Sequence, residues 1–383
     1  MKDARGFLEF FAGGGMARAG LGPGWRCLFA NDADPRKCAA YRDNFGGDDL
    51  AEGDIAALGL EDMPAARADL AWASFPCQDV SLAGARAGLS GARSGLFFAF
   101  WRLIEELSNA GRAPKIVVLE NVAGLLTSNR GADFTAIAQT LAASGYRVSA
   151  LVLDASDFTP QSRPRLFIFG LGPDAAPRFS QRPAVASAYT PQALLNAVDD
   201  LPQGCAFAWR WLAARPGLRR NAALSDIVDL DTDDWNEDLG AAAVRMMSAR
   251  GRIAVEKLIE TGGRHIGAAY RRIRIENGAR VQRVEARFDG LAGCLRTPAG
   301  GSSRQMLLLV EKGAVKARLL NPQEASRLMG LPDGYRLPER TTAALKLCGD
   351  GVAVPVVRWI AESILEPALG APDEKRNPGQ QAA

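Results

Sequence analysis

Through about residue 172 the chain alternates short apolar runs with longer segments in which apolar residues recur at helical spacing. This pattern predicts an α/β domain in which helices flank a parallel sheet. The predicted strands are Phe7–Phe11, Cys27–Ala30, Leu70–Ala73, Ile116–Leu119, Val148–Leu153 and Leu166–Phe169. Two crossover helices are expected, one over Pro35–Phe45 with Asp34 as its N-cap, the other over Gly95–Leu107 with a wide apolar face.

The composition changes near residue 173. Prolines become frequent, two tryptophans follow at positions 209 and 211, and an acidic stretch runs from residue 226 to 238. We therefore place a domain boundary there. The predicted organisation is a first α/β domain (1–172) and a smaller second domain of mixed structure (173–315). In a return segment (316–367) the helical pattern resumes and ends in a helix over Ala353–Glu366. The last residues (368–383) are predicted to form a polar, disordered tail.

A basic hairpin is predicted within the second domain. From Arg271 to Val284, arginine alternates with isoleucine or valine on both sides of Asn277-Gly278, a strong signal for a two-residue turn. One face of this ribbon is expected to consist of arginine. Between residues 264 and 304 nine arginines stand against three acidic residues, a net charge of +6. Such a ribbon suits a DNA groove or backbone, and the alternative is an edge hairpin kept soluble by its charge.

Length and composition limit the class of protein. The 383 residues, 48% of them apolar, suffice for about two domains with real cores. No apolar run approaches the ~18–20 residues of a membrane span, and Glu9 interrupts any signal-peptide core, so we expect an intracellular, cytoplasmic protein. The net charge of +3 is small. With eight lysines among 46 cationic residues the other 38 are arginine, which fits a GC-rich genome as well as phosphate and guanine recognition.

The side chains available for catalysis are restricted. A single histidine, His265, excludes Ser-His-Asp triads, two-histidine zinc sites and the H-x-E signature of zinc deaminases. The six cysteines form no C-x-x-C pair, so neither a disulfide framework nor a zinc knuckle is indicated. Catalysis must therefore use Cys, Asp, Glu or Arg.

A glycine-rich turn follows the first predicted strand. Phe7–Phe11 runs into Ala12-Gly13-Gly14-Gly15, which is expected to leave bare amides beside a helix N-terminus and so to form a ligand cradle, although any tight turn needs glycine. The acid Asp32, about 20 residues beyond the glycines, is placed to accept both ribose hydroxyls of a nucleoside, since Asp34 already fills the N-cap role. Asp54, after a short third strand, is positioned for an adenine amino group.

Three further segments beside strands carry reactive side chains. Leu70–Ala73 leads into a proline-stiffened loop with Cys77, a candidate nucleophile, although isolated cysteines are more often small core residues. Glu120 follows Ile116–Leu119 and is expected in the same crevice, partly desolvated and able to hold a proton near neutral pH. Arg163 and Arg165 alternate so that both point the same way, toward an anion, a carbonyl oxygen or structural carboxylates.

In this order the motifs resemble those of the C5-cytosine DNA methyltransferases that use S-adenosylmethionine, and the resemblance spans nearly the whole chain. The matching segments are F-x-G-x-G at Phe11–Gly15, the acids Asp32 and Asp54, P-C-Q at Pro76–Gln78, E-N-V at Glu120–Val122, Q-x-R-x-R at Gln161–Arg165, and R-x-L-x-x-x-E-x-x-R-L-M-G-x-P at Arg318–Pro332. The resemblance implies a Rossmann-like methyltransferase sheet over 1–172 with a target-recognition domain over 173–315, and a monomer that acts on double-stranded DNA without a metal. A cognate restriction endonuclease could accompany it.

The resemblance also implies residue roles. Cys77 would attack C6 of a flipped-out cytosine, Glu120 would assist at N3 and the exocyclic amine, and Arg165, with Arg163 nearby, would steady O2. Contacts to S-adenosylmethionine, released as S-adenosylhomocysteine, are implied for Phe11, Ala12, Gly13, Gly15, Asp32, Ala33, Asp54, Ile55, Pro76, Leu96, Asp350 and Val352. DNA contacts are expected of Gln78, Ser81, Arg272, Arg274, Arg296, Thr297, Gly300 and Gly301.

The chain departs from the family pattern at two motifs. Where the family has Asp-Leu-Phe-Ala-Gly and a second glycine after G-x-G, this chain has Glu9 at the start and Met16 at the end. The final G-N-A/S-V reads Gly349-Asp350-Gly351-Val352, so an acid replaces an amide and slightly altered cofactor affinity is expected.

Two alternatives stay open at this point. One is a tRNA cytosine-5 methyltransferase of the same fold, which the absence of its Cys-Phe-Thr tripeptide and the large basic recognition region disfavour. The other is a catalytically silent DNA-binding relative, which the intact P-C-Q and E-N-V motifs disfavour. A small-molecule methyltransferase would explain neither the cysteine nor the second domain.

Overall fold

The computed structural model describes residues 4–76, 95–213, 220, 222–276, 278–296 and 304–370. It divides into two compact units, the first formed by residues 1–153, 164–216 and 356–383 and the second by 154–163 and 217–355. This division differs from the boundary expected at residue 172. Residues 173–216 belong to the first unit because Val152 donates its N–H to the carbonyl of Tyr189 and Arg210 donates to that of Val148.

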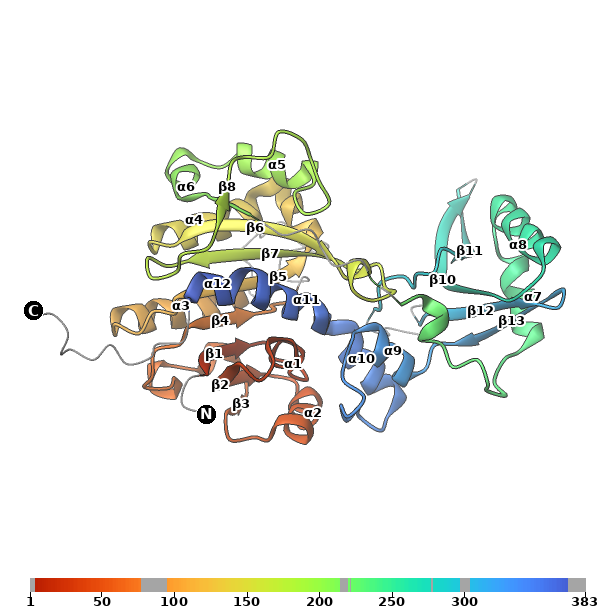
Figure 1. Cartoon of the computed structure of the whole chain (residues 1–383), viewed down its shortest axis with the longest axis horizontal. Coiled ribbons are helices and arrows are strands. Elements are labelled where there is room, and N and C mark those ends of the chain that lie inside the picture. Colours follow the sequence, from red (N-terminus) through yellow and green to blue (C-terminus); the bar gives the residue numbers. More distant parts are fainter. Residues whose placement is uncertain are drawn as a thin grey trace, which may run out of the picture. The chain divides into compact units, whose positions relative to one another are not determined.

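A seven-stranded sheet forms the centre of the first unit, with the strand order β3-β2-β1-β4-β5-β7-β6 (Figure 1). Its strands are β1 (Arg5–Phe10), β2 (Trp25–Asp32), β3 (Leu50–Glu52), β4 (Leu70–Ala73), β5 (Ile116–Val122), β6 (Arg147–Asp154) and β7 (Pro164–Leu171). Strands β1 to β5 pair in parallel, whereas β7 runs antiparallel to β5. All six strands expected from the apolar runs are confirmed, but the expectation of a wholly parallel sheet is wrong.

Helices of the first unit bury one face of this sheet through a large apolar cluster that includes Leu8, Phe10, Phe100 and Phe134. The helices in this cluster are α3 (Gly95–Asn109), α4 (Ala132–Ala143), α5 (Gln192–Asp199) and α6 (Gln203–Ala208). The first unit also contains α1 (Met16–Leu21), α2 (Pro35–Phe45) and α12 (Glu366–Leu369), with the short strands β8 (Phe179–Ser180) and β9 (Trp211–Leu212). Both predicted crossover helices are confirmed. Asp34 caps α2 as expected, since its carboxylate accepts the N–H of Arg36 at 3.0 Å.

The structure also contains short 3₁₀ turns and a C-terminal helix. The 3₁₀ turns are Ile55–Ala57, Leu60–Asp62, Ala123–Leu126, Ser128–Gly131, Ala155–Asp157 and Leu224–Asp226. The last helix is α11 (Val354–Ile360), which continues through a wider π turn (Ala361–Leu365) into α12. The sequence predicted a disordered tail from residue 368, but residues 368 and 369 still belong to α12. Residues 371–383 of the predicted tail lie outside the described residues.

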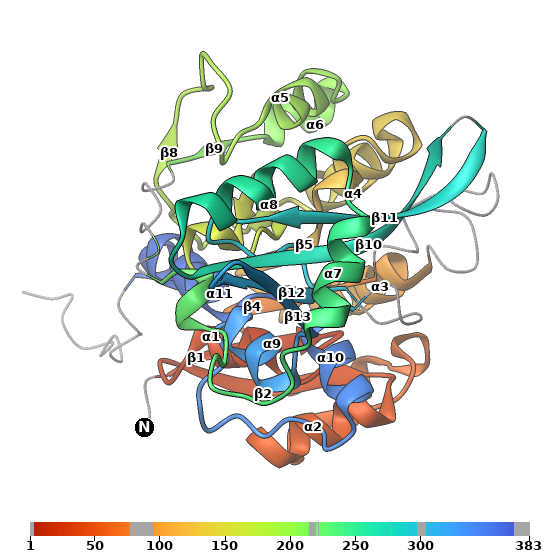
Figure 2. The same cartoon turned by 90° about the vertical axis from the view of Figure 1, so that its right-hand side faces the viewer.

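An antiparallel sheet with the order β11-β10-β12-β13 forms the second unit. Its strands are β10 (His265–Glu276), β11 (Ala279–Arg287), β12 (Met306–Glu311) and β13 (Ala314–Leu319), and its helices are α7 (Glu237–Arg245), α8 (Ala249–Thr261), α9 (Pro322–Leu328) and α10 (Thr341–Asp350). Figure 2 shows α7 and α8 beside this sheet. Gly240 lets α7 approach β13 closely, because a Cβ there would lie 2.0 Å from the carbonyl oxygen of Val315. The helical pattern expected from residue 316 begins only at Pro322.

The predicted hairpin is confirmed as β10 and β11, which pair from Ala268–Arg287 to Glu276–Ala279. Its arginines, however, lie on both faces. Side chains alternate along a strand and directly opposed residues share a face, so Arg272 and Arg274 lie on one face with Arg283. Arg271 and Arg280 lie on the other face with the exposed side chains of Ile273 and Ile275. The expectation of a single arginine face is therefore wrong.

Candidate active site

The glycine turn at the carboxyl end of β1 has a left-handed backbone at three positions. The φ angles of Phe11, Gly13 and Gly15 are 57°, 58° and 75°. A Cβ on Gly15 would lie 2.5 Å from the ring of Phe45, so this glycine is needed for packing. A Cβ on Gly13 would meet nothing closer than 4.0 Å, so this glycine is needed for its backbone conformation and opens onto free space.

The main-chain amides of this turn are not bare, contrary to the expectation from the sequence. The N–H of Ala12 donates to the carbonyl of Asn31 at 2.9 Å, that of Gly13 to Asp32 Oδ2 at 2.8 Å, and that of Gly15 back to Ala12 at 2.8 Å. A cradle for phosphate would need free donors. This turn instead presents the half-exposed Phe11 and Gly13 above a buried carboxylate.

Glu9, a residue that sequence reasoning treated only as a conservative departure, lies on β1 and directs its side chain to the first turn of α1. Its carboxylate accepts hydrogen bonds from the main-chain N–H groups of Arg18 and Ala17, and its side chain is 1% exposed. Burial raises the pKa of Glu9 to about 8, although Arg18 acts in the opposite direction. Among the residues that the structure describes, its Oε2 atom has no hydrogen-bond partner. An acid within an apolar strand was the sequence signal for this group.

Glu9→Gln is expected to flatten the pH dependence of stability. Because the pKa of Glu9 rises from 4.5 to about 8 on folding, the folded state binds one more proton between these values. The stabilisation from this group is therefore present below the unfolded pKa and is lost as the pH rises through the folded pKa, by at most about 1.4 kcal/mol per pH unit. Urea unfolding at about pH 6 and about pH 8 should show a drop in the wild type that Glu9→Gln lacks. The exposed Glu105→Gln on α3 should keep the wild-type drop, and parallel curves for Glu9→Gln and wild type would contradict this assignment.

The carboxylate of Asp32, at the end of β2, lies against the glycine turn. It is 8% exposed, and its Oδ1 atom also accepts the N–H of Asp34 at 2.8 Å. Ala33 beside it is exposed. An ionised carboxylate has about four lone-pair sites, so these two bonds leave acceptor capacity for a ligand's hydroxyl groups.

Asp54 and Ile55 follow β3 at the same edge of the sheet. Asn31 holds this segment in place, because its side-chain amide donates to the carbonyls of Ala51 at 2.9 Å and Gly53 at 3.0 Å. The exposed Asp54 caps the following 3₁₀ turn through the N–H of Ala56, and Ile55 is 2% exposed. The structure thus brings the predicted acids Asp32 and Asp54 to the ends of neighbouring strands.

The loop after β4 is tied to β5. Asn121, the middle residue of E-N-V, donates from its side-chain amide to the carbonyl of Phe75 at 3.2 Å, and both residues are buried. Pro76 follows and is exposed, whereas Leu96 in the first turn of α3 is half-buried. The predicted residues Cys77, Gln78 and Ser81 lie outside the described residues.

Glu120 and Arg165 form an ion pair between β5 and β7. The Arg165 Nε atom lies 3.2 Å from Glu120 Oε1, and the side chains are 15% and 8% exposed for Arg165 and Glu120, respectively. Val122 is opposite Arg165 in the register, so Glu120 is its diagonal neighbour on the same face. The structure therefore brings Glu120 and Arg165, two of the residues that the sequence singled out, together in the first unit.

Arg163 differs from Arg165 in its surroundings, although alternation predicted that the two would point the same way. Strand β7 begins only at Pro164, and Arg163 belongs to the second unit with a side chain that is 2% exposed. Its guanidinium donates to the main-chain carbonyls of Leu295, Gly349 and Gly351. These contacts favour a role in holding loops over contact with a substrate.

The remaining predicted residues lie in the second unit or outside the described part. Asp350 ends α10 and is exposed, and Val352 is buried; their contact with a cofactor stays a prediction. Arg272 and Arg296 lie over the ring of Tyr270, at 5.7 and 5.8 Å from its centroid. Both Arg272 and Arg274 pair with Glu285. Thr297, Gly300 and Gly301 lie outside the described residues.

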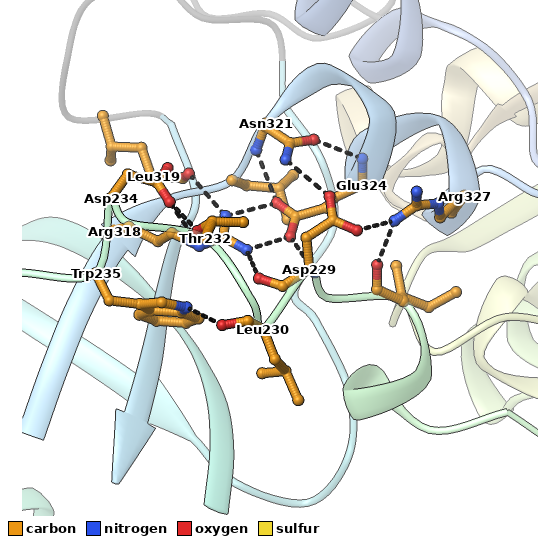
Figure 3. Close-up of polar contacts among 12 residues, drawn as sticks. Asp229, Leu230, Thr232, Asp234, Trp235, Arg318, Leu319, Asn321, Glu324 and Arg327 are labelled. Atoms are coloured by element: carbon orange, nitrogen blue, oxygen red, sulfur yellow. Dashed lines mark hydrogen bonds and ion pairs between the residues drawn. The ribbon is translucent and has the colours of Figure 1, made fainter. Parts of the chain in front are cut away.

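The late motif forms a buried polar network in the second unit (Figure 3). Arg318 on β13 donates to Glu324 on α9 at 2.9 Å, and the two side chains are 2% and 0% exposed. Glu324 also accepts the N–H groups of Asn321 and Asp229, each at 2.9 Å. The guanidinium of Arg318 donates to the Asp229 carbonyl at 2.7 Å and lies 4.6 Å from the ring centroid of Trp235. This motif therefore joins α9 and β13 to residues 229–235.

In the described ranges no cluster of three or more His, Cys, Asp or Glu side chains could hold a metal ion. No helix in that part of the chain is long and apolar enough to span a membrane.

Comparison with known proteins identifies the family. The chain is 29% identical over 374 residues to Type II methyltransferase M.NlaX of Neisseria lactamica, covering 96% of this chain and 98% of that protein. It is 27% identical over 361 residues to Type II methyltransferase M.HhaI of Haemophilus parahaemolyticus, covering 94% and 93%. A solved DNMT2 variant of Spodoptera frugiperda shares the fold, with a TM-score of 0.60 at 17% identity over 95% of this chain and 100% of that chain. The family model described as C-5 cytosine-specific DNA methylase matches residues 6–366, and the chain belongs to this family.

Proposed function

We propose that this protein transfers a methyl group from S-adenosylmethionine to C5 of a cytosine that is flipped out of a specific sequence in double-stranded DNA. One observation carries the proposal: the ion pair of Glu120 and Arg165 lies at the end of β5, where Asn121 also anchors the loop that leads to Pro76 and Cys77. An acid and an arginine there suit a polar ring, and the next residue after Pro76 is a thiol. Family membership supports the same chemistry.

The edge formed by the ends of β1, β2 and β3 fits a nucleoside cofactor without phosphate. The N–H groups of Ala12, Gly13 and Gly15 already have acceptors, and the buried Glu9 accepts the N–H groups of Ala17 and Arg18 in the first turn of α1, so an anion would find no free donor at these positions. Asp32 would accept the ribose hydroxyls, and Asp54 would accept from the adenine amino group. S-adenosylmethionine has these groups and, when bound, supplies an electrophilic methyl on a sulfonium.

The chain's own side chains would make cytosine reactive at C5. The Cys77 thiolate adds to C6, which converts the ring to an enamine with a nucleophilic C5. Glu120 hydrogen-bonds or protonates N3 and contacts the exocyclic amine, while Arg165 stabilises the negative charge at O2. After C5 is methylated it loses its proton, and Cys77 leaves C6 with its electron pair so that the aromatic ring is restored. The base must be extruded first, which costs a few kcal/mol that contacts from the second unit would offset.

Bisulfite sequencing of DNA from cells that express the protein tests the function. Bisulfite deaminates cytosine but spares 5-methylcytosine, so one experiment reports activity, base and sequence context. We expect full protection at cytosines in one short sequence context. Protected cytosines in tRNA but not in DNA would favour the tRNA alternative, and DNA binding without protection would favour a silent relative. The related Type II methyltransferases favour the DNA outcome.

We further expect DNA to lie on the Tyr270 side of the hairpin. This side carries Arg272, Arg274 and the nearby Arg296, so replacing Arg272 and Arg274 by alanine should weaken binding and lower the slope of log Kd against log salt by up to about 2. The loss of two positive charges sets that upper limit. The change should be smaller than the limit because the shared partner Glu285 already neutralises part of this charge. Alanine at Arg271 and Arg280 removes two positive charges from the opposite face and is the matched control. An equal fall in the slope for both pairs would contradict this orientation.

A further inference from the structure

Arg163 connects two segments of the second unit that are far apart in the sequence. Its Nη1 atom donates to the carbonyl of Leu295 at 3.0 Å, and its Nη2 atom donates to those of Gly349 at 2.9 Å and Gly351 at 2.6 Å. The last turn of a helix leaves carbonyls without partners, and Gly349 lies in the last turn of α10. A single buried guanidinium thus holds both the end of α10 and residue 295.

Residues 292–296, which we call the recognition arm, are held on several sides. The N–H of Ala292 donates to the carbonyl of Pro160 at 2.7 Å, and the N–H of Leu295 donates to Gln161 Oε1 at 3.0 Å. The hydroxyl of Tyr270 donates to the carbonyl of Cys294 at 2.7 Å. The arm ends at Arg296 above the Tyr270 ring. Its main chain therefore has little freedom to move independently of Arg163 and its neighbours.

These contacts separate Arg163 from its neighbours. In the part of the chain that the structure describes, Gln161 and Tyr270 bond to the arm and not to Gly349 or Gly351, whereas Arg163 bonds to both segments. The planar fork of a guanidinium can donate to acceptors on two sides at once, and a lysine ammonium is a compact point charge that cannot span them in the same way. A shift of the Gly349–Gly351 turn would therefore be felt at Leu295 through one rigid group.

We infer that Arg163 is a positioning residue that couples cofactor binding at the Gly349–Val352 turn to DNA binding through the recognition arm. This inference rests on the proposed function, under which the turn contacts S-adenosylmethionine and Arg296 contacts DNA. When the cofactor orders the turn, Arg163 holds Leu295 and hence Arg296 in the arrangement that binds DNA. By linkage, DNA must then strengthen cofactor binding by the same factor.

The test measures this coupling factor in the full chain. One measurement gives the Kd of a DNA duplex that contains the sequence context found by bisulfite sequencing, with and without saturating S-adenosylhomocysteine. The other gives the Kd of S-adenosylhomocysteine, with and without this duplex. The coupling factor is the ratio of the Kd without the other ligand to the Kd with it. We expect a factor of at least about fivefold in the wild type, equal for DNA and for S-adenosylhomocysteine, and a factor below about twofold in Arg163→Lys. Tyr270→Phe, which removes one bond from the arm and none from the turn, should weaken DNA binding equally with and without S-adenosylhomocysteine and so keep the factor.

A second measurement needs no variant. Hydrogen exchange of the wild type should slow over residues 292–296 when S-adenosylhomocysteine is added without DNA. A wild-type factor retained in Arg163→Lys, or unchanged exchange in the arm, would overturn the inference. Neither measurement depends on methyl transfer, so both are distinct from the bisulfite result. Methylation without coupling refutes the role of Arg163 alone, whereas a chain that never methylates cytosine refutes the proposed function.

Discussion

Cys77→Ser is expected to abolish methyl transfer, lowering the rate by at least about 10³-fold, since loss of the nucleophile in a covalent catalyst can cost up to about 10⁶-fold. The reason is chemical: a thiolate forms readily near neutral pH, and a serine hydroxyl does not, so the C6 adduct that activates C5 cannot form. The rate is measured as transfer of a labelled methyl group to duplex DNA containing the context found by bisulfite sequencing. DNA affinity should change little, because serine is close to cysteine in size and shape.

A duplex with 5-fluorocytosine at the target makes the same prediction visible as a bond. When S-adenosylmethionine is supplied, C5 is methylated but fluorine cannot leave it as a proton does, so the wild type should remain attached to the DNA through Cys77 as a denaturation-resistant complex. Cys77→Ser should give none. Cys205→Ala is the matched control, since Cys205 is buried on α6 among apolar residues and should be dispensable for both transfer and trapping. A serine variant that still methylates DNA, or one that still forms the trapped complex, would refute the covalent mechanism.

Glu324→Gln is expected to destabilise the second unit by about 3–5 kcal/mol, because it removes the buried counter-charge of Arg318 and leaves only the exposed Asp234, 3.7 Å away. The substitution also weakens the acceptors used by the N–H groups of Asp229 and Asn321. Buried groups cannot recover these bonds from water, so the loss is larger than for a surface pair. Urea unfolding followed by the fluorescence of Trp235, whose ring lies over Arg318, reports on this region.

A more exposed ion pair, formed by another residue of β13, provides the control. Lys316 lies 3.6 Å from Glu237, which is 67% exposed, and Glu237→Gln should change stability by less than about 1 kcal/mol. If Glu324→Gln were as mild as Glu237→Gln, the network of Figure 3 would not contribute to stability as argued. The comparison separates a buried ion pair from the general effect of removing one negative charge.

Where local signals were strong, the elements could be predicted to the residue. The strand Leu70–Ala73 is a four-residue apolar run that is buried on both faces, and Pro35–Phe45 has an N-cap at Asp34 and a glycine after its last residue. Both sets of bounds match the prediction. Strand β5 continues to Val122, three residues beyond the predicted end, because its register with β7 extends past the apolar run. Nothing local encodes that β7 runs antiparallel.

The candidate site divides in the same way. Residue type and order along the chain indicated the family and singled out Asp32, Asp54, Glu120 and Arg165, which stand at strand ends on one edge of the sheet. The ion pair of Glu120 with Arg165 is visible only in the structure. Sequence spacing could not assign Arg163 to loops 132 and 186 residues away, nor divide the hairpin arginines between two faces.

Burial and distant pairing are what only the tertiary structure decided. Glu9 becomes a buried group with a raised pKa because other elements exclude water from it, a property that no residue type carries by itself. The N–H groups of Ala12 and Gly13 are satisfied by Asn31 and Asp32, and Glu324 accepts the N–H of Asp229, which is 95 residues away in the sequence. Local sequence therefore determined which groups exist and on which elements, and long-range packing determined which of them remain available for chemistry.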